Sequence, residues 1–200
     1  MYISLSSLLV PTVLLCVMAA YLLASISSAI LVAKLFRLTD PRRAGSGNPG
    51  ATNVYRLGGA VPASIVLLFD ISKGLVPVYG AFLLGVAPLG LALVASAACL
   101  GHMYPIFFRF QGGKGVATAL GCYCALGWDF ASALIGVWLL IYMWLRRSSL
   151  AAISAACSAP ALAYWLHPDY TAAVAMLSAL IIWQHRDNIG RLIQGTEPKV

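Results

Sequence analysis

Apolar residues fill long stretches of this chain, and polar residues gather in the short segments between them. A bilayer hydrocarbon core of about 30 Å is crossed by about 20 apolar residues in a helix. The pattern therefore predicts an all-α, polytopic membrane protein with seven spans, folded as one domain over residues 1–200. The predicted spans are 4–33, 61–84, 88–108, 116–127, 130–145, 150–166 and 170–185. The fourth is short, which is typical of a tilted, re-entrant or sheltered helix.

Basic residues follow every second apolar stretch. Because Lys and Arg accumulate in cytoplasmic loops, this alternation predicts the N-terminus outside and the C-terminus in the cytoplasm. The connections at 85–87, 128–129 and 167–169 carry neither Lys nor Arg. The basic positions are Lys34, Arg37, Arg42, Arg43, Arg56, Arg109, Lys114, Arg146, Arg147, Arg186, Arg191 and Lys199.

Composition supports the bilayer as solvent. Apolar residues make up 61% of the chain, only 10% of residues are charged, and the mean hydropathy is +0.88. Soluble domains carry about 25% charged residues. The net charge of +7 favours anionic lipid headgroups and phosphorylated substrates over nucleic acid as partners. The first stretch lacks the basic start of a signal peptide and is expected to be retained.

The five cysteines lie inside apolar runs. Neither their number nor their spacing fits a disulfide framework or a zinc site. We interpret them as packing residues, and we expect no metal.

The segment at 45–53 reads GSGNPGATN and follows a turn rich in Pro and Arg. Its three glycines let the backbone curl and expose successive N–H groups, and Ser46, Asn48 and Thr52 add short hydrogen-bonding side chains. This composition predicts an anion-binding loop. The alternative is a simple turn.

A second glycine-rich segment, QGGKGVAT at 111–118, carries Lys114 at a predicted helix N-terminus. A mobile ammonium beside free backbone N–H groups suits a phosphate. The segment is not a Walker A loop, because Gly115 stands where Ser or Thr should follow the lysine and Phe108 stands where Gly is required. The alternative is a lysine that snorkels from a helix end.

Other polar residues form smaller candidate groups. His185 and Asn188 are three apart and would share one helix face, either toward a ligand or as a solvated cap. Asp70 and Lys73 lie in an apolar helix, where ionisable groups are costly, and form either a functional or a structural ion pair. His102 is either a base or a packed donor.

Several common chemistries have no support in the sequence. No His is followed five positions later by Asp, and no HExxH, GxSxG or CxxC pattern occurs. A transporter or channel for a phosphorylated solute is the competing class of protein. Such a protein should carry polar residues near the middle of the membrane and show paired half-structures, whereas the polar residues here gather on one face. A noncatalytic lipid scaffold would leave the glycine loops unexplained.

Taken in order, GSGNPGATN (45–53), GHMYP (101–105), GGKGVAT (112–118), SLA (149–151) and HRDN (185–188) closely resemble the bacterial PlsY family. These are membrane acyl-phosphate:glycerol-3-phosphate acyltransferases, and the resemblance covers essentially the whole chain. It implies a seven-helix enzyme of the bacterial inner membrane with a cytoplasmic site. Its products would be phosphate and 1-acyl-glycerol 3-phosphate, acylated at the sn-1 hydroxyl in the first step of phospholipid synthesis.

The resemblance also implies the partners and the roles of residues. Acyl phosphate would be the donor rather than a thioester, no cofactor would be needed, and the enzyme that makes acyl phosphate would be a transient partner. The implied acyl-phosphate residues are Ser46, Gly47, Asn48, Gly50, Thr52, Asn53, Gly113 and Lys114. The implied glycerol 3-phosphate residues are Arg56, Ser149, His185 and Asn188.

The proton acceptor stays open in this interpretation. His102, His185 or a substrate phosphate can take the hydroxyl proton, with Lys114 as the further catalytic candidate. Arg109 and Gln111 depart from the family pattern, which has Gly and Lys at these positions.

Overall fold

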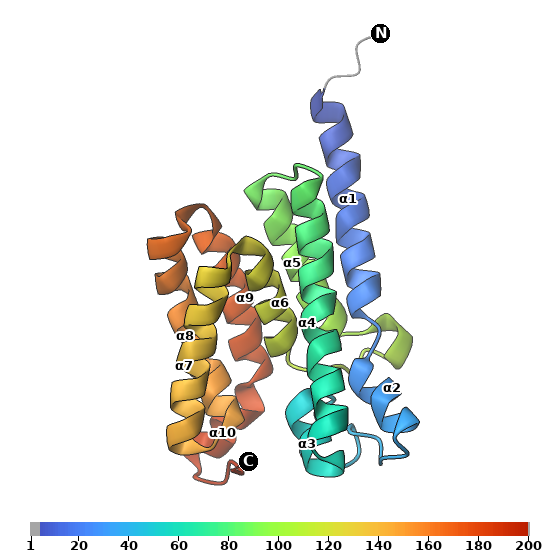
Figure 1. The fold of residues 1–200 in the computed structure, drawn as a ribbon, viewed down its shortest axis with the longest axis vertical. Helices are drawn as coiled ribbons and strands as arrows, with labels where there is room; N and C mark the ends of the chain where they lie inside the picture. Colours follow the sequence, from blue (N-terminus) through green and yellow to red (C-terminus); the bar gives the residue numbers. More distant parts are fainter. Residues whose placement is uncertain (1–4, 200) are drawn as a thin grey trace.

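The computed structural model describes residues 5–199, which form ten α-helices and two short 3-10 helices (Figure 1). These helices confirm the prediction of an all-helical protein. The α-helices are α1 (Leu5–Ala24), α2 (Ser28–Leu35), α3 (Ala51–Gly58), α4 (Ala60–Leu83), α5 (Pro88–Met103), α6 (Val116–Leu126), α7 (Trp128–Leu145), α8 (Ser148–Leu166), α9 (Thr171–Gln184) and α10 (Arg186–Ile193). The 3-10 helices are η1 (Ile106–Phe108) and η2 (Pro168–Tyr170).

Five segments in the described chain are long and apolar enough to cross a membrane. They are Val10–Leu35, Ala60–Leu83, Pro88–Phe108, Trp128–Leu145 and Ser148–Leu166. The predicted spans 116–127 and 170–185 correspond to α6 and α9, which have only 11 and 14 residues. The count of seven crossings therefore stays a prediction. α1 begins at the opposite end of the bundle from α10 (Figure 1), as an odd count requires.

The predicted span 4–33 corresponds to the segment Val10–Leu35, although the helix is broken within it; residue 4 lies outside the described residues. α1 ends at Ala24 and α2 begins at Ser28. Serine side chains compete with the helical hydrogen bonds, and Ser25 and Ser27 lie within the break. The Ile26 carbonyl inside the break accepts a hydrogen bond from Lys73 Nζ at 3.3 Å. The break is thus tied to the middle of α4.

Glycines bring α4 and α6 into backbone contact. A Cβ atom added at Gly74 would lie 2.0 Å from the carbonyl oxygen of Thr118, and one at Gly121 would lie 2.0 Å from that of Ile71. Small residues at helix interfaces allow this close approach. The short helix α6 is therefore held against the middle of α4.

We expect Gly74→Ala to destabilise the protein strongly. The added methyl group meets backbone atoms, which cannot rotate away, so the cost should reach or exceed the about 1–3 kcal/mol typical of overpacking. The measurement is the thermal midpoint of the purified protein in detergent. Gly80→Ala in the same helix is the matched control, because no atom lies within 4 Å of its added Cβ. Equal midpoints for the two variants would contradict the tight α4–α6 contact.

Exposed tryptophans mark both ends of the C-terminal helices. Trp128 begins α7 and Trp165 lies near the end of α8, while Trp144 and Trp183 lie at the opposite ends of α7 and α9. All four side chains are exposed. Tryptophan is enriched at the two membrane–water interfaces, so these residues agree with helices α7 to α9 facing lipid.

Candidate active site

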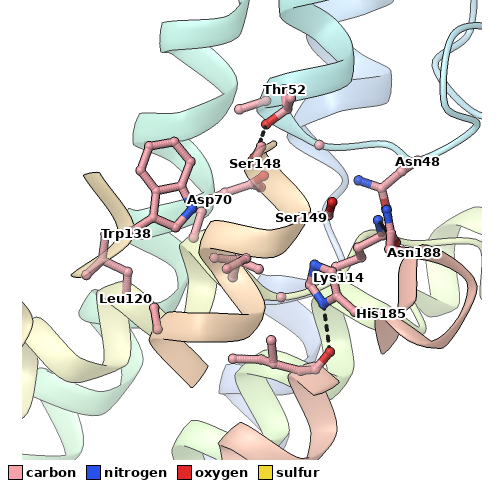
Figure 2. Close-up of a pocket in the computed structure, with 18 of the residues that line it drawn as sticks. Asn48, Thr52, Asp70, Lys114, Leu120, Trp138, Ser148, Ser149, His185 and Asn188 are labelled. Carbon is pink, nitrogen blue, oxygen red and sulfur yellow. Dashed lines mark hydrogen bonds between the residues drawn. The ribbon is translucent and has the colours of Figure 1, made fainter. Parts of the chain in front are cut away.

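A cavity of about 710 Å³ lies between the helices, with contributions from each of the helices α3 to α10 (Figure 2). One part of its wall is polar and the other is apolar. The polar wall includes Ser46, Asn48, Thr52, Arg56, Lys114, Ser148, Ser149, His185, Asn188, Arg191 and Glu197. The apolar wall includes Leu67, Ile71, Leu120, Tyr123, Leu134, Ile135, Trp138, Leu139, Ala152, Ala156 and Ile181. A ligand with an anionic head and a long apolar tail would match both parts.

The cavity brings together most of the residues that the sequence singled out. Those that line it are Ser46, Asn48, Gly50, Thr52, Asn53, Arg56, Asp70, His102, Lys114, Ser149, His185 and Asn188. Gly47, Gly113 and Lys73 are not part of its lining. The two glycines instead shape the loops behind the wall: Gly47 has a φ of +72°, which favours glycine.

The side chain of Asn53 holds the 45–53 loop in its curled form. Its Nδ2 donates to the carbonyl oxygens of Pro41 and Ala44, both at 2.9 Å, and its Oδ1 accepts from the backbone N–H of Ser46 at 2.9 Å. Asn53 is buried. The loop leads into α3, where the N–H groups of the first two residues, Ala51 and Thr52, precede the helical hydrogen bonds and therefore suit an anion.

A second hydrogen bond holds the start of α3 against α8. The hydroxyl groups of Thr52 and Ser148 lie 3.2 Å apart and share a hydrogen bond (Figure 2). Thr52 belongs to α3, and Ser148 begins α8. The polar wall is thus formed by segments that are 96 residues apart in sequence.

Lys114 stands at the centre of the polar wall. Its backbone lies between Gly113 and Gly115, directly before α6. Its Nζ donates to Asn188 Oδ1 at 2.5 Å, so the loop before α6 contacts α10 (Figure 2). Gly115 has a φ of +80°, which turns the chain into the helix.

The surroundings of Lys114 lower its pKa to about 8. Burial is the largest cause, and Arg191 and Arg56 act in the same direction, while Glu197 and Asp187 oppose them. The ammonium therefore remains mostly charged at neutral pH. An anion bound beside it would find a cation that is poorly hydrated and strongly attractive.

His185 and Asn188 both reach the cavity, although the predicted shared face of one helix is wrong. α9 ends at Gln184 and α10 begins at Arg186, so His185 lies at the break. The His185 Nδ1 lies 2.8 Å from the carbonyl oxygen of Ile181, to which it donates. The neutral ring then carries its lone pair on Nε2, which is free to accept a proton.

Glu197, which sequence reasoning missed, organises the same wall. Its carboxylate accepts hydrogen bonds from Ser149 Oγ at 2.5 Å, Asn188 Nδ2 at 2.6 Å and Arg191 Nε at 2.7 Å. Its side chain is buried. Although burial raises the pKa of this carboxyl group, the three donors outweigh it and lower the pKa, so the group is ionised at neutral pH. Arg147 adds a bond to the Glu197 carbonyl oxygen at 3.2 Å.

The two departures from the family pattern lie away from the cavity. Arg109 and Gln111 are exposed and do not line it. Arg109 has a φ of +57°, a conformation that glycine adopts without strain. Among residues 5–199, no three His, Cys, Asp or Glu side chains gather as metal ligands would.

The fold and the site together define a helical membrane protein whose cavity joins an anion-binding wall to an apolar wall. Comparison with known proteins is in agreement. Residues 14–195 match the family model for glycerol-3-phosphate acyltransferase. The chain is 54% identical over 184 residues to the glycerol-3-phosphate acyltransferase of Idiomarina loihiensis, covering 92% of this chain and 94% of that protein. It is 57% identical over 181 residues to that of Pseudoalteromonas translucida, covering 90% and 89%.

Two crystal structures share the fold. Both are of PlsY, an integral membrane glycerol 3-phosphate acyltransferase, in its glycerol 3-phosphate and lysophosphatidic acid forms. The first matches with a TM-score of 0.89 and 41% identity over 94% of this chain and 95% of that one. The second has a TM-score of 0.87 and 40% identity over 94% of each. The chain belongs to the PlsY family of glycerol-3-phosphate acyltransferases, and it is an integral, multi-pass membrane protein.

Proposed function

We propose that this acyltransferase moves a fatty acyl group from acyl phosphate to the sn-1 hydroxyl of glycerol 3-phosphate. The products are 1-acyl-glycerol 3-phosphate and phosphate. The observation that carries the proposal is one cavity with an apolar wall and two sets of anion-binding groups, which meet at Lys114. A donor with a phosphate and an alkyl chain, and an acceptor with a second phosphate, match these three parts.

The donor phosphate lies between the 45–53 loop and Lys114 in this proposal. Ser46, Asn48 and Thr52 line the cavity on this side, and the N-terminus of α3 adds backbone N–H groups. The alkyl chain extends along the apolar wall of α4, α6 and α7. The acyl carbon is then positioned at the junction of the two walls.

Glycerol 3-phosphate binds opposite, against Arg56, Ser149, His185 and Asn188. Ser149 and Asn188 are oriented by the Glu197 carboxylate, so their geometry exists before the substrate arrives. Preorganised polar groups cost little to align during the reaction. The relatives crystallised with glycerol 3-phosphate and with lysophosphatidic acid support this pair of ligands.

The acyl transfer needs no nucleophile from the protein, because acyl phosphate is a mixed anhydride and is already activated. The glycerol oxygen bonds to the acyl carbon, the bond from that carbon to the phosphate oxygen breaks, and phosphate leaves. Lys114 stabilises the charge that grows on the leaving phosphate. The hydroxyl proton passes to His185 Nε2, whose lone pair is left free by the bond from Nδ1 to Ile181.

The donor is tested with purified protein, glycerol 3-phosphate and one acyl donor at a time. Acyl phosphate, acyl-CoA and acyl carrier protein thioester are compared, and both lysophosphatidate and released phosphate are measured. We expect equal amounts of the two products from acyl phosphate and neither from the thioesters. Lysophosphatidate formed from a thioester without phosphate release would overturn the choice of donor.

Separate alanine substitutions of Arg56, His185 and Asn188 are expected to raise KM for glycerol 3-phosphate more than KM for acyl phosphate. Each removes a contact to the acceptor, which is worth about 1.5–3 kcal/mol when a charged group takes part, or about tenfold or more in KM. Steady-state kinetics with each substrate varied in turn provide the measurement. Arg146→Ala is the control, because this exposed arginine does not line the cavity. A larger change in the acyl-phosphate KM would reassign these residues to the donor.

We also propose that the site faces the cytoplasm from the bacterial inner membrane, as the distribution of basic loops supports. Lys199→Cys in a chain with Cys157→Ser should react with an impermeant thiol reagent only from the cytoplasmic side. Ala87→Cys, an exposed position in a loop without basic residues, should react only from outside. The reverse pattern would place the site outside. Transient contact with the enzyme that makes acyl phosphate stays a prediction.

A further inference from the structure

A buried polar cluster adjoins the cavity and has no part in the chemistry described above. It consists of Ser28 on α2, Asp70 and Lys73 on α4, and His102 on α5. All four side chains are buried, and Asp70 is only 2% exposed. Charges inside a membrane-spanning helix are costly unless they are paired, and where they occur they usually have a functional role.

Asp70 is held from two sides. Its Oδ1 accepts from Ser28 Oγ at 2.6 Å and from Lys73 Nζ at 2.8 Å. Lys73 also donates to the Ile26 carbonyl, which is exposed by the break between α1 and α2. The carboxylate is therefore fixed relative to three helices, α1, α2 and α4.

His102 connects this carboxylate to the loop that carries Lys114. Its Nδ1 lies 3.6 Å from Asp70 Oδ1. The opposite edge of the ring packs on Gly113, where an added Cβ would lie 2.2 Å from His102 Nε2. The backbone N–H of Gly113 donates to the His102 carbonyl oxygen at 3.1 Å. Both the ring and the backbone of His102 thus contact the residue that precedes Lys114.

Gly113 also approaches the other phosphate loop. An added Cβ at Gly113 would lie 3.1 Å from the carbonyl oxygen of Pro49, so Gly113 fits between His102 and the 45–53 loop. Any movement of the ring would be transmitted to both loops, because protein interiors are close-packed. Their separation sets how the donor phosphate meets Lys114.

We propose that Asp70 and His102 are positioning residues: Ser28 and Lys73 hold Asp70, Asp70 orients His102, and His102 sets the loop that places Lys114 against the donor phosphate. The proposal rests on the proposed function of Lys114. It assigns the cluster to the rate of acyl transfer rather than to acceptor binding, because Ser149 and Asn188 lie on α8 and α10 and are held there by Glu197.

A double substitution separates this role from a purely structural one. Asp70→Asn with Lys73→Met removes both buried charges, and replacing a buried ion pair by neutral groups is often harmless to stability. We expect a thermal midpoint close to that of the wild type. We expect kcat to fall about tenfold to a hundredfold, as a misplacement of about 1 Å can cause, while KM for glycerol 3-phosphate changes less than about twofold.

Ser28→Ala is the second variant, and it keeps both charges in place. It loses one hydrogen bond to Asp70, so kcat should fall about threefold to tenfold with the fold retained. Asp129→Asn is the control, because it removes a second Asp–His pair of the described residues: Asp129 and His167 lie 3.0 Å apart and do not line the cavity. Its kcat should match that of the wild type.

The results decide the proposal in either direction. Normal kcat in Ser28→Ala, or in a double variant of normal stability, would overturn it. If the double variant does not fold, Ser28→Ala alone decides. A wild type that makes no lysophosphatidate from acyl phosphate would instead overturn the proposed function, so the two failures are distinguishable.

Discussion

Lys114→Ala is expected to lower kcat by about a hundredfold or more while the protein still inserts and purifies normally. Negative charge grows on the departing phosphate as the acyl bond breaks, so a positioned ammonium stabilises the transition state more than the bound donor. Loss of one such preorganised donor typically costs about 3 kcal/mol. The measurement is kcat at saturating concentrations of both substrates. Lys114→Arg should recover only part of the rate, because a planar guanidinium replaces a compact ammonium between two glycines.

The pH dependence gives an independent check on the same residue. Because the pKa of Lys114 is lowered to about 8, the ammonium is present below this pH and is lost as the pH rises through it. The kcat/KM of the wild type should therefore fall above about pH 8, and the residual activity of Lys114→Arg should not. A well-folded Lys114→Ala enzyme with near-normal kcat would reduce this lysine to a snorkelling residue.

Glu197→Ala should raise KM for glycerol 3-phosphate about tenfold or more. Ser149, Asn188 and Arg191 all donate to this carboxylate, and one hydrogen bond to a charged group is worth about 1.5–3 kcal/mol. Without it, the donors lose the orientation in which they face the acceptor. Glu197→Gln should have an intermediate effect, since the amide oxygen can still accept but no longer attracts Arg191. Steady-state kinetics with glycerol 3-phosphate varied provide the measurement.

The control for Glu197 is Asp169→Ala, which removes an exposed acidic side chain away from the cavity. Its KM for glycerol 3-phosphate should be unchanged. An unchanged KM in Glu197→Ala as well would show that the tail does not organise the acceptor side. A loss of folding in Glu197→Ala with normal KM in Glu197→Gln would give the residue a structural role alone.

The residues that line the polar wall were largely predictable from the sequence. In a chain this apolar, short polar residues and glycines between apolar stretches are conspicuous, and Asn48, Thr52 and Lys114 all reach the cavity. Glu197 was not predictable in this way. A single glutamate in a C-terminal tail has no periodicity or spacing, and only the folded chain brings Ser149 to it from 48 residues away.

Helix boundaries were harder to predict than helices. Hydropathy averages over a window, so it does not detect the break after Ala24, which lies within apolar sequence. By contrast, α9 ends at Gln184, where polar residues follow and where the predicted span 170–185 also ends. The number of crossings is uncertain from the sequence for the same reason, since apolarity alone does not separate an 11-residue helix from a full span. The single domain over 1–200 also stays a prediction.

The brevity of α6 places the residues before it inside the helix bundle. At about 1.5 Å per residue, α6 extends for about 16 Å, or roughly half of a hydrocarbon core. Thr118, in its first turns, lies against Gly74 near the middle of the long helix α4. Lys114, two residues before α6, therefore lies beside the interior of α4, where Leu67, Asp70 and Ile71 line the same cavity. An activated donor bound there is enclosed by helices on several sides, which favours transfer to the bound glycerol hydroxyl over hydrolysis.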